Sequence, residues 1–76
     1  MLLSDIKAGV KVKVVSLQST GLPRRRMMDL GLIPGAEIEV IRKSPLGDPT
    51  AYGIRGAQIA LRVEEANQIE VERIEG

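Results

Sequence analysis

The sequence predicts an all-β, or mainly β, fold: a small closed or nearly closed barrel of about five short strands with one short helix. Apolar and polar residues alternate along several segments, which is the period of strands with one buried and one exposed face. Turns rich in glycine and proline separate these segments. Closure into a barrel is expected to remove the edges of an open sheet. At this length we expect one domain over residues 1–76.

Two strands are predicted in the first half of the chain. The residues from Val10 to Val14 alternate valine with lysine, and a second alternation covers residues 36–42. In both segments the apolar positions are expected to face the core, with lysines and glutamates in solvent. The expected inward residues are Val12, Val14, Ile38 and Val40.

The second half predicts a loop, a hairpin, a helical turn and a last strand. Residues 44–49 contain two prolines and a glycine and are expected to form an exposed loop. Residues 51–55 and 57–63 flank Gly56 as the strands of a tight hairpin. Residues 64–67 are good helix formers over barely one turn, which predicts a 3-10 or single α turn. The inward positions of the last two strands are expected to be Ile59, Leu61, Val63, Ile69 and Val71.

The sequence bounds the helix near residues 22–30 at both ends. Pro23 falls in the first turn, where proline is tolerated, and Gly31 falls where a left-handed cap is favoured. Pro34 and Gly35 then predict a turn into the second strand. At 100° per residue one side of the helix is apolar. The side chains expected to enter the core from this stripe are Met27 and Leu30.

The other side of the helix carries arginines and an exposed methionine. Arg24, Arg25 and Met28 lie away from the apolar stripe, and arginine and methionine are both enriched at protein interfaces. We take these three residues as candidate partner-binding residues, with Leu46 and Asp48 of the loop as a second candidate. The alternative is a solvated helix face, and the residue types alone do not decide between the two.

The composition excludes most catalytic chemistry. There is no histidine and no cysteine, so imidazole catalysis and thiolate chemistry are unavailable. Neither glycine-rich phosphate-binding pattern occurs. The glutamates are spread along strands, where they are more often a solvated face than a cation site. We therefore predict no enzyme activity and assign no catalytic, cofactor-binding or metal-ligating residue, while weak transition-metal binding stays open.

Nucleic acid is not an expected partner. Small barrels often bind RNA, but the net charge is only +1 and Tyr52 is the one aromatic residue, so no platform exists for stacking bases. The N-terminus does not read as a secretory signal, and no apolar run could span a bilayer. Together with the absence of cysteine, this predicts a cytoplasmic protein.

Four motifs follow one another along the chain. They are Arg-Arg-Met-Met-Asp-Leu-Gly-Leu-Ile-Pro-Gly over residues 25–35, Glu-Ile-Glu-Val over 37–40, Ser-Pro-Leu-Gly-Asp-Pro over 44–49 and Ile-Ala-Leu-Arg-x-x-x-Ala-x-x-Ile-x-Val over 59–71. In this order they resemble the ferrous iron transport protein A family, FeoA. The resemblance extends from Leu3 to Val71. It implies an SH3-like barrel and a non-enzymatic cytoplasmic accessory role in ferrous iron uptake. The implied partner is the FeoB permease with its cytoplasmic GTPase domain, which would be the chain's only link to the membrane.

A similar domain forms the C-terminal part of metal-dependent repressors of the diphtheria toxin repressor type. There it can contribute side-chain oxygens to a metal site from the segment just before the equivalent helix. The matching segment here, Thr20 to Pro23, has no carboxylate or amide side chain, so no metal ligand is carried over. Direct metal binding or sensing is the second hypothesis, and nucleic-acid binding the third. Self-association into a homo-oligomer is left open.

Overall fold

The fold is seen in a computed structural model that describes residues 1–19 and 21–74. Five strands, two α-helices and one 3-10 turn follow one another along this part of the chain. In chain order they are η1 (Leu3–Asp5), β1 (Lys11–Leu17), α1 (Gly21–Asp29), β2 (Glu37–Lys43), β3 (Thr50–Ile54), β4 (Ala57–Leu61), α2 (Val63–Ala66) and β5 (Ile69–Arg73).

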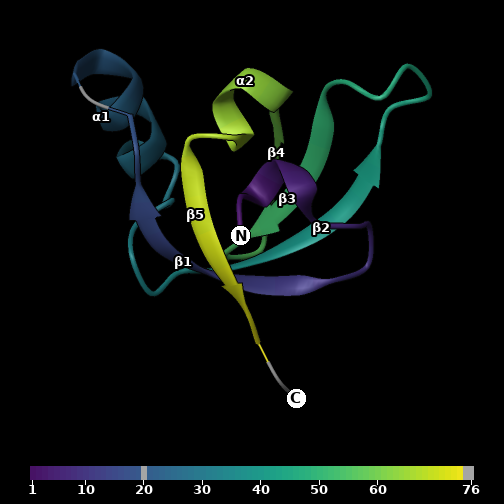
Figure 1. The fold of residues 1–76 in the computed structure, drawn as a ribbon, viewed down its shortest axis with the longest axis horizontal. Helices are drawn as coiled ribbons and strands as arrows, with labels where there is room; N and C mark the ends of the chain where they lie inside the picture. Colours follow the sequence, from purple (N-terminus) through teal and green to yellow (C-terminus); the bar gives the residue numbers. More distant parts are fainter. Residues whose placement is uncertain (20, 75–76) are drawn as a thin grey trace.

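The five strands form one antiparallel sheet in the order β4-β3-β2-β1-β5. The register shifts between Val14 and Ser16 and again between Val40 and Arg42, and such bulges bend and twist a strand. The sheet therefore curls around its own inner face, with the helices gathered at one end (Figure 1). The predicted mainly β fold is confirmed. Strands β4 and β5 do not pair, however, so the expectation that closure removes both edges is wrong.

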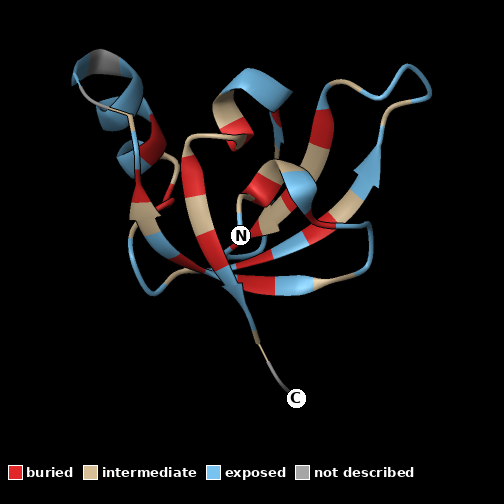
Figure 2. Cartoon of the chain, viewed as in Figure 1, coloured by how far each residue is buried: buried red, intermediate tan, exposed pale blue. Residues whose placement is uncertain are grey.

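The core lies inside this curl, and Figure 2 shows its alternating positions along the strands. The inward residues expected from the sequence include eight that are buried: Val12, Val14, Met27, Ile38, Val40, Leu61, Ile69 and Val71. Leu30 and Ile59 are only partly buried and pack against that cluster. The core also takes in residues that the alternation did not identify: Leu3, Ile6, Leu17, Leu32, Tyr52, Ile54 and Ala66.

The sequence predicted Val63 to face the core, and this prediction is wrong. Val63 is 54% exposed and begins α2, because the strand ends two residues earlier at Leu61. The backbone N–H of Val63 donates to the Asp48 carboxylate at 2.9 Å, and the N–H of Arg62 donates to Glu65 Oε1 at 3.0 Å. These are the donors that a helix start leaves without partners inside the helix. Side chains that satisfy them make a helix favourable here.

Gly31 ends α1 in the predicted left-handed conformation, with φ of 91°. The N–H of Gly31 donates to the carbonyl of Met28 at 3.0 Å, and the N–H of Leu32 donates to the carbonyl of Met27 at 2.9 Å. This pair of bonds is a Schellman motif, in which the residues on both sides of the glycine commonly touch. Met27 and Leu32 are both buried in the core. The cap therefore joins the helix to the barrel.

The turn at Pro34 and Gly35 is fixed to β1. The N–H of Ala36 donates to the carbonyl of Ile33 at 2.9 Å, and Gly35 has φ of 90°, which together describe a type II turn. The N–H of Gly35 donates to the carbonyl of Val14, and the N–H of Val14 donates to the carbonyl of Ala36, both at 2.8 Å. The chain thus enters β2 already paired with β1.

Truncation of Met27 should destabilise the fold more than truncation of Leu30. Met27→Ala removes a side chain that is 2% exposed, and such deletions cost about 2–5 kcal/mol. Leu30→Ala should cost less, because this side chain is only partly buried. Urea unfolding followed by circular dichroism measures both. Equal losses would show that Leu30 contributes as much to the core as Met27.

Candidate docking surface

Three segments meet at the end of the barrel where the helices lie: α1, the one-turn helix α2, and the loop of residues 44–49 between β2 and β3. Figure 1 shows them in a row, with α2 between the other two. The two sets of candidate residues are therefore not adjacent. Arg24, Arg25 and Met28 lie on α1, whereas Leu46 and Asp48 lie in the loop.

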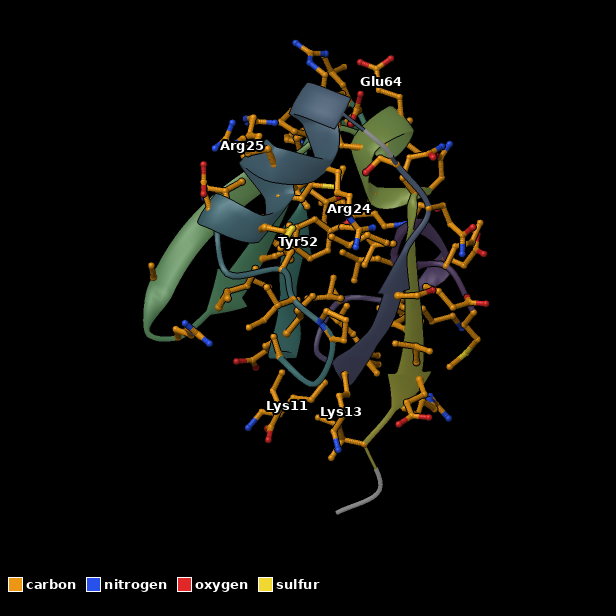
Figure 3. The ribbon with its side chains drawn as sticks, turned by 90° about the vertical axis from the view of Figure 1, so that its left-hand side faces the viewer. Lys11, Lys13, Arg24, Arg25, Tyr52 and Glu64 are labelled. Atoms are coloured by element: carbon orange, nitrogen blue, oxygen red, sulfur yellow. The ribbon has the colours of Figure 1, made fainter. Side chains whose placement is uncertain are left out.

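The arginines of α1 have different surroundings. Arg24, expected to point outward, turns back so that its Nη1 donates to the carbonyl of Leu17 at 3.2 Å. Arg26 forms an ion pair with Glu65 of α2. Arg25 makes no side-chain hydrogen bond or ion pair within residues 1–19 and 21–74, and Figure 3 shows Arg24 and Arg25 leaving the helix in different directions. Arg25 is thus the freest cation of the three.

Met28 and Leu46 are exposed apolar groups of this end, as is Val63 at the start of α2. Met28 is 46% exposed on α1, and Leu46 is 94% exposed at the tip of the loop. The loop is held by its own hydrogen bonds: Ser44 Oγ donates to the carbonyl of Asp48, and the N–H of Gly47 donates to the carbonyl of Ser44, both at 2.8 Å. Leu46 is therefore presented to solvent by a loop with internal support.

Asp48 is occupied within the chain and is not a free docking group. Its Oδ1 accepts the hydrogen bond from the N–H of Val63 at 2.9 Å, and its Oδ2 lies 3.8 Å from Arg62 Nη1. A carboxylate at this position complements the positive end of a helix. We therefore assign Asp48 to fastening the loop onto α2, in place of the partner-binding role expected from the sequence.

Glu65 connects α2 to α1. It accepts from the backbone N–H of Arg62 at 3.0 Å and forms the ion pair with Arg26. The hydrogen bond from Arg62, with a further contribution from Arg26, lowers the pKa of Glu65 below its usual value. This contact was not predicted from the sequence. The signal was the position of Glu65 three residues after Arg62, the residue that precedes the helix, which is the spacing of a capping box.

A hollow of about 480 Å³ lies where α1 and α2 meet the end of β1. On its floor, Ser19 Oγ donates to the sulfur of Met27 at 3.3 Å. Glu64, labelled in Figure 3, lines it from the α2 side. The hollow is lined by Gln18, Ser19, Pro23, Met27, Glu64, Glu65 and Gln68. It gives this end of the barrel a recess beside the exposed residues of α1.

The described residues contain no group of three or more aspartate or glutamate side chains placed to hold a metal ion. Thr20, the first residue of the segment that the sequence led us to consider for metal ligands, lies outside the described residues. Tyr52 is 2% exposed, and its burial raises the pKa of its hydroxyl. The ring is therefore not on the surface. Within the described chain no helix has the length and apolar character needed to cross a membrane.

Comparison with known families gives a match over almost the whole chain. The FeoA domain matches residues 1–73. The chain belongs to the FeoA family. This domain is a non-catalytic accessory domain, in agreement with the prediction of no enzyme activity.

The relatives of the chain carry iron-transport names. It is 36% identical over 74 residues to an Fe(2+) transport protein A/Fe(2+) transporter FeoB fusion protein of Porphyromonas gingivalis, covering 97% of this chain and 9% of that protein. Iron(II) transport protein A of Clostridium thermocellum superimposes with a TM-score of 0.94 at 38% identity, covering 97% of this chain and 46% of that chain. The chain thus spans less than half the length of both of these proteins.

Two further structures bear on the fold. FeoA of Stenotrophomonas maltophilia, solved in complex with zinc and described as an SH3 domain protein, has a TM-score of 0.84 and 29% identity over 95% of this chain and 89% of that chain. The predicted SH3-like fold is confirmed by this likeness. The manganese regulator SloR has a TM-score of 0.84 at 16% identity, covering 97% of this chain and 34% of that chain. At that identity the likeness to SloR is one of fold.

The charge of Glu65 should contribute to stability in a pH-dependent way. The folded-state pKa is lowered, so its contribution is present above the unfolded-state pKa and is lost as pH falls through the folded-state pKa. Glu65→Gln should therefore be less stable than the unmodified protein at neutral pH and equally stable in acid. Thermal melts over a pH series measure the difference. If Glu65→Gln stayed less stable than the unmodified protein in acid, the stabilising effect of Glu65 would not depend on its charge.

Proposed function

We propose that this chain is a cytoplasmic, non-enzymatic accessory protein of ferrous iron uptake that docks on an FeoB-type permease and reaches the membrane only through that partner. The observation that carries this proposal is the Porphyromonas gingivalis fusion protein, in which an Fe(2+) transport protein A part shares one polypeptide with the FeoB transporter. A fusion holds its two parts at high effective concentration, which is useful when the two act in contact. Whether or not the two parts share a chain, that contact is made through the surface of the domain.

The α1 end of the barrel has the features expected of that surface. Arg25 is exposed and free of ion pairs among the described residues, and Met28 lies on the same helix with 46% of its surface exposed. Arg24 stays exposed while donating to β1, so it contributes charge from a fixed position. Arginine and methionine are favoured at interfaces, where a few such anchors carry most of the binding energy. Leu46, at the tip of the loop beyond α2, is a second contact on the same end.

Substitution of the α1 residues tests the proposal. The triple variant Arg24→Ala, Arg25→Ala and Met28→Ala should bind the purified GTPase domain of the organism's own FeoB permease at least about tenfold more weakly. Isothermal titration measures this affinity, and circular dichroism confirms that the fold is kept. Iron uptake in cells lacking the native gene should fall in parallel.

A matched control exists on the outer face of β1. Lys11, Lys13 and Val15 are likewise two exposed cations and one exposed apolar residue, with Val15 44% exposed. The lysines sit opposite strand glutamates in the register pairs Lys11 with Glu39 and Lys13 with Glu37. Replacing these three by alanine should leave affinity for the permease within about twofold. If both triple variants bind as the unmodified chain does, α1 is not the docking surface.

Direct metal binding is the second candidate function, favoured by the zinc in the Stenotrophomonas maltophilia FeoA structure. The hollow beside α1 offers Glu64 and Glu65 carboxylates, but Glu65 is already taken up by Arg26 and Arg62. We therefore expect anaerobic titration with ferrous or manganese ion to give no micromolar binding. Micromolar affinity that Glu64→Gln abolished would establish this second function instead.

A further inference from the structure

The outer edge of β4 is open. The hairpin between β3 and β4 turns through Arg55 and Gly56, both with positive φ, and places Ile54 opposite Ala57. In a two-residue hairpin the residues that flank the turn form a hydrogen-bonded pair, and such pairs recur at every second position. Ala57, Ile59 and Leu61 therefore bond to β3. The N–H and C=O groups of Gln58 and Ala60 point away from the sheet.

The opposite edge of the sheet is not open in the same way. The N–H of Val71 in β5 donates to the carbonyl of Met1 at 2.7 Å, and Leu2 forms a bridge with Glu70. The start of the chain thus lies along β5. No such segment bonds to Gln58 or Ala60 in the part of the chain that the structure describes. In Figure 3 the hairpin of β3 and β4 forms one margin of the molecule.

β4 also lacks the features that normally protect an edge. Natural edge strands carry lysine, proline, inward charges or bulges that prevent another strand from adding. The five residues of β4 are Ala-Gln-Ile-Ala-Leu, with no charge and no proline, and their pairing with β3 runs without a register shift. The strand is exposed at Ala57, Gln58 and Ala60. It is therefore able to accept a further strand.

The sheet next to this edge has a hollow with a basic rim. Arg42, Ala51 and Ala60 are register partners across β2, β3 and β4, and both alanines are too small to fill the outer face. They form part of the floor of a hollow of about 480 Å³, whose lining contains no acidic side chain. Its lining residues are Arg42, Lys43, Ser44, Pro45, Pro49, Ala51 and Ala60.

The charged side chains at both ends of β4 and beside the hollow are basic, while Glu39 lies on the same face in register with Gly53 and Gln58. Arg55 precedes β4 and Arg62 follows it, while Arg42 and Lys43 stand beside the hollow. The nearest acidic group of the loop, Asp48, is engaged with Val63 and Arg62. A second copy of the chain paired through β4 would bring two such sets of cations together, which is unfavourable. The charge instead complements an acidic partner.

We propose that the β4 edge is a strand-addition site for an extended acidic segment of a partner protein. Gln58 and Ala60 supply the backbone hydrogen bonds, which give affinity without regard to sequence. A carboxylate on the added strand opposite Ala60 extends over the two alanines toward Arg42 and Lys43, which supplies selectivity. This site lies on a different element from the α1 surface and does not depend on which protein α1 contacts.

An NMR titration of the full chain tests the proposal. The probe is a synthetic octapeptide of alternating glutamate and valine with blocked ends, and the control is the same peptide with lysine in place of glutamate. The glutamate peptide should shift the amide signals of Gln58 and Ala60 and slow their exchange with solvent. The lysine peptide, which has the backbone but not the carboxylates, should shift both signals much less at the same concentration.

Two substitutions separate the backbone contribution from the charge. Ala60→Pro removes an N–H that does not bond to β3, and Ala60→Ser at the same position keeps it. The proline variant should weaken peptide binding by about two- to tenfold, with the serine variant unaffected. Arg42→Gln should weaken it by about two- to fivefold and reduce its dependence on salt. The triple α1 variant should bind the peptide normally, so failure of the α1 proposal is distinguishable from failure of this one.

Four results would overturn the inference. Two concern the peptides: no shift at Gln58 and Ala60, or equal binding of the lysine peptide. The other two are full binding by both the Ala60→Pro and Arg42→Gln variants, and a concentration-dependent dimer that protects these amides without peptide. The last result would assign the edge to a second copy of this chain. If Ala60→Pro fails to fold, Arg42→Gln and the lysine peptide still decide.

Discussion

The reversal of the chain at Gly31 is the constraint on which the barrel depends. A nine-residue helix such as α1 is marginal in water by itself. It persists because Met27, just before the reversal, and Leu32, just after it, both enter the core. Only a left-handed residue allows that geometry, and glycine adopts it without the steric cost of a Cβ. The turn at Pro34 and Gly35 follows at once and bonds to β1, so β2 begins in register.

Charged side chains hold in place the segments at the helix end of the barrel, which the small core does not fix by itself. The one-turn helix α2 is too short to be stable through its own hydrogen bonds, and its start is supplied with partners from elsewhere. Asp48 reaches it from the loop, and Glu65 binds both the backbone of Arg62 and the side chain of Arg26. The three segments at this end of the barrel are thereby linked. The same links explain why Leu46 and Met28 are presented on supported elements.

The two surfaces proposed for protein partners would bind through different kinds of group. The α1 surface offers side chains, with free charge at Arg25 and an exposed sulfur at Met28. The β4 edge offers backbone groups at Gln58 and Ala60, with Arg42 and Lys43 beside them. Both suit a protein that acts by docking on a partner, which is the role proposed for it in iron uptake.

The sequence alone determined where the five strands lie, apart from the ends of β1 and β4, together with the extent of α1 to within one residue and the two glycine turns. These features follow from local periodicity and backbone sterics. The family motifs added the SH3-like fold and the proposed partner. What the sequence could not determine was the use of each charged side chain. Arg24 and Asp48 read as free surface groups, yet Arg24 donates to Leu17, and Asp48 binds Val63 fifteen residues away.

The tertiary structure also decided which edge of the sheet stays open. Alternation along β4 specifies which side chains face inward, but it carries no information on whether another segment covers the outward backbone groups. That depends on where distant parts of the chain lie: the start of the chain covers part of β5 and leaves β4 bare. The pattern of residues within one strand or turn determines that element, because the interactions involved are local. Contacts between elements form only once the sheet has curled and brought distant residues together.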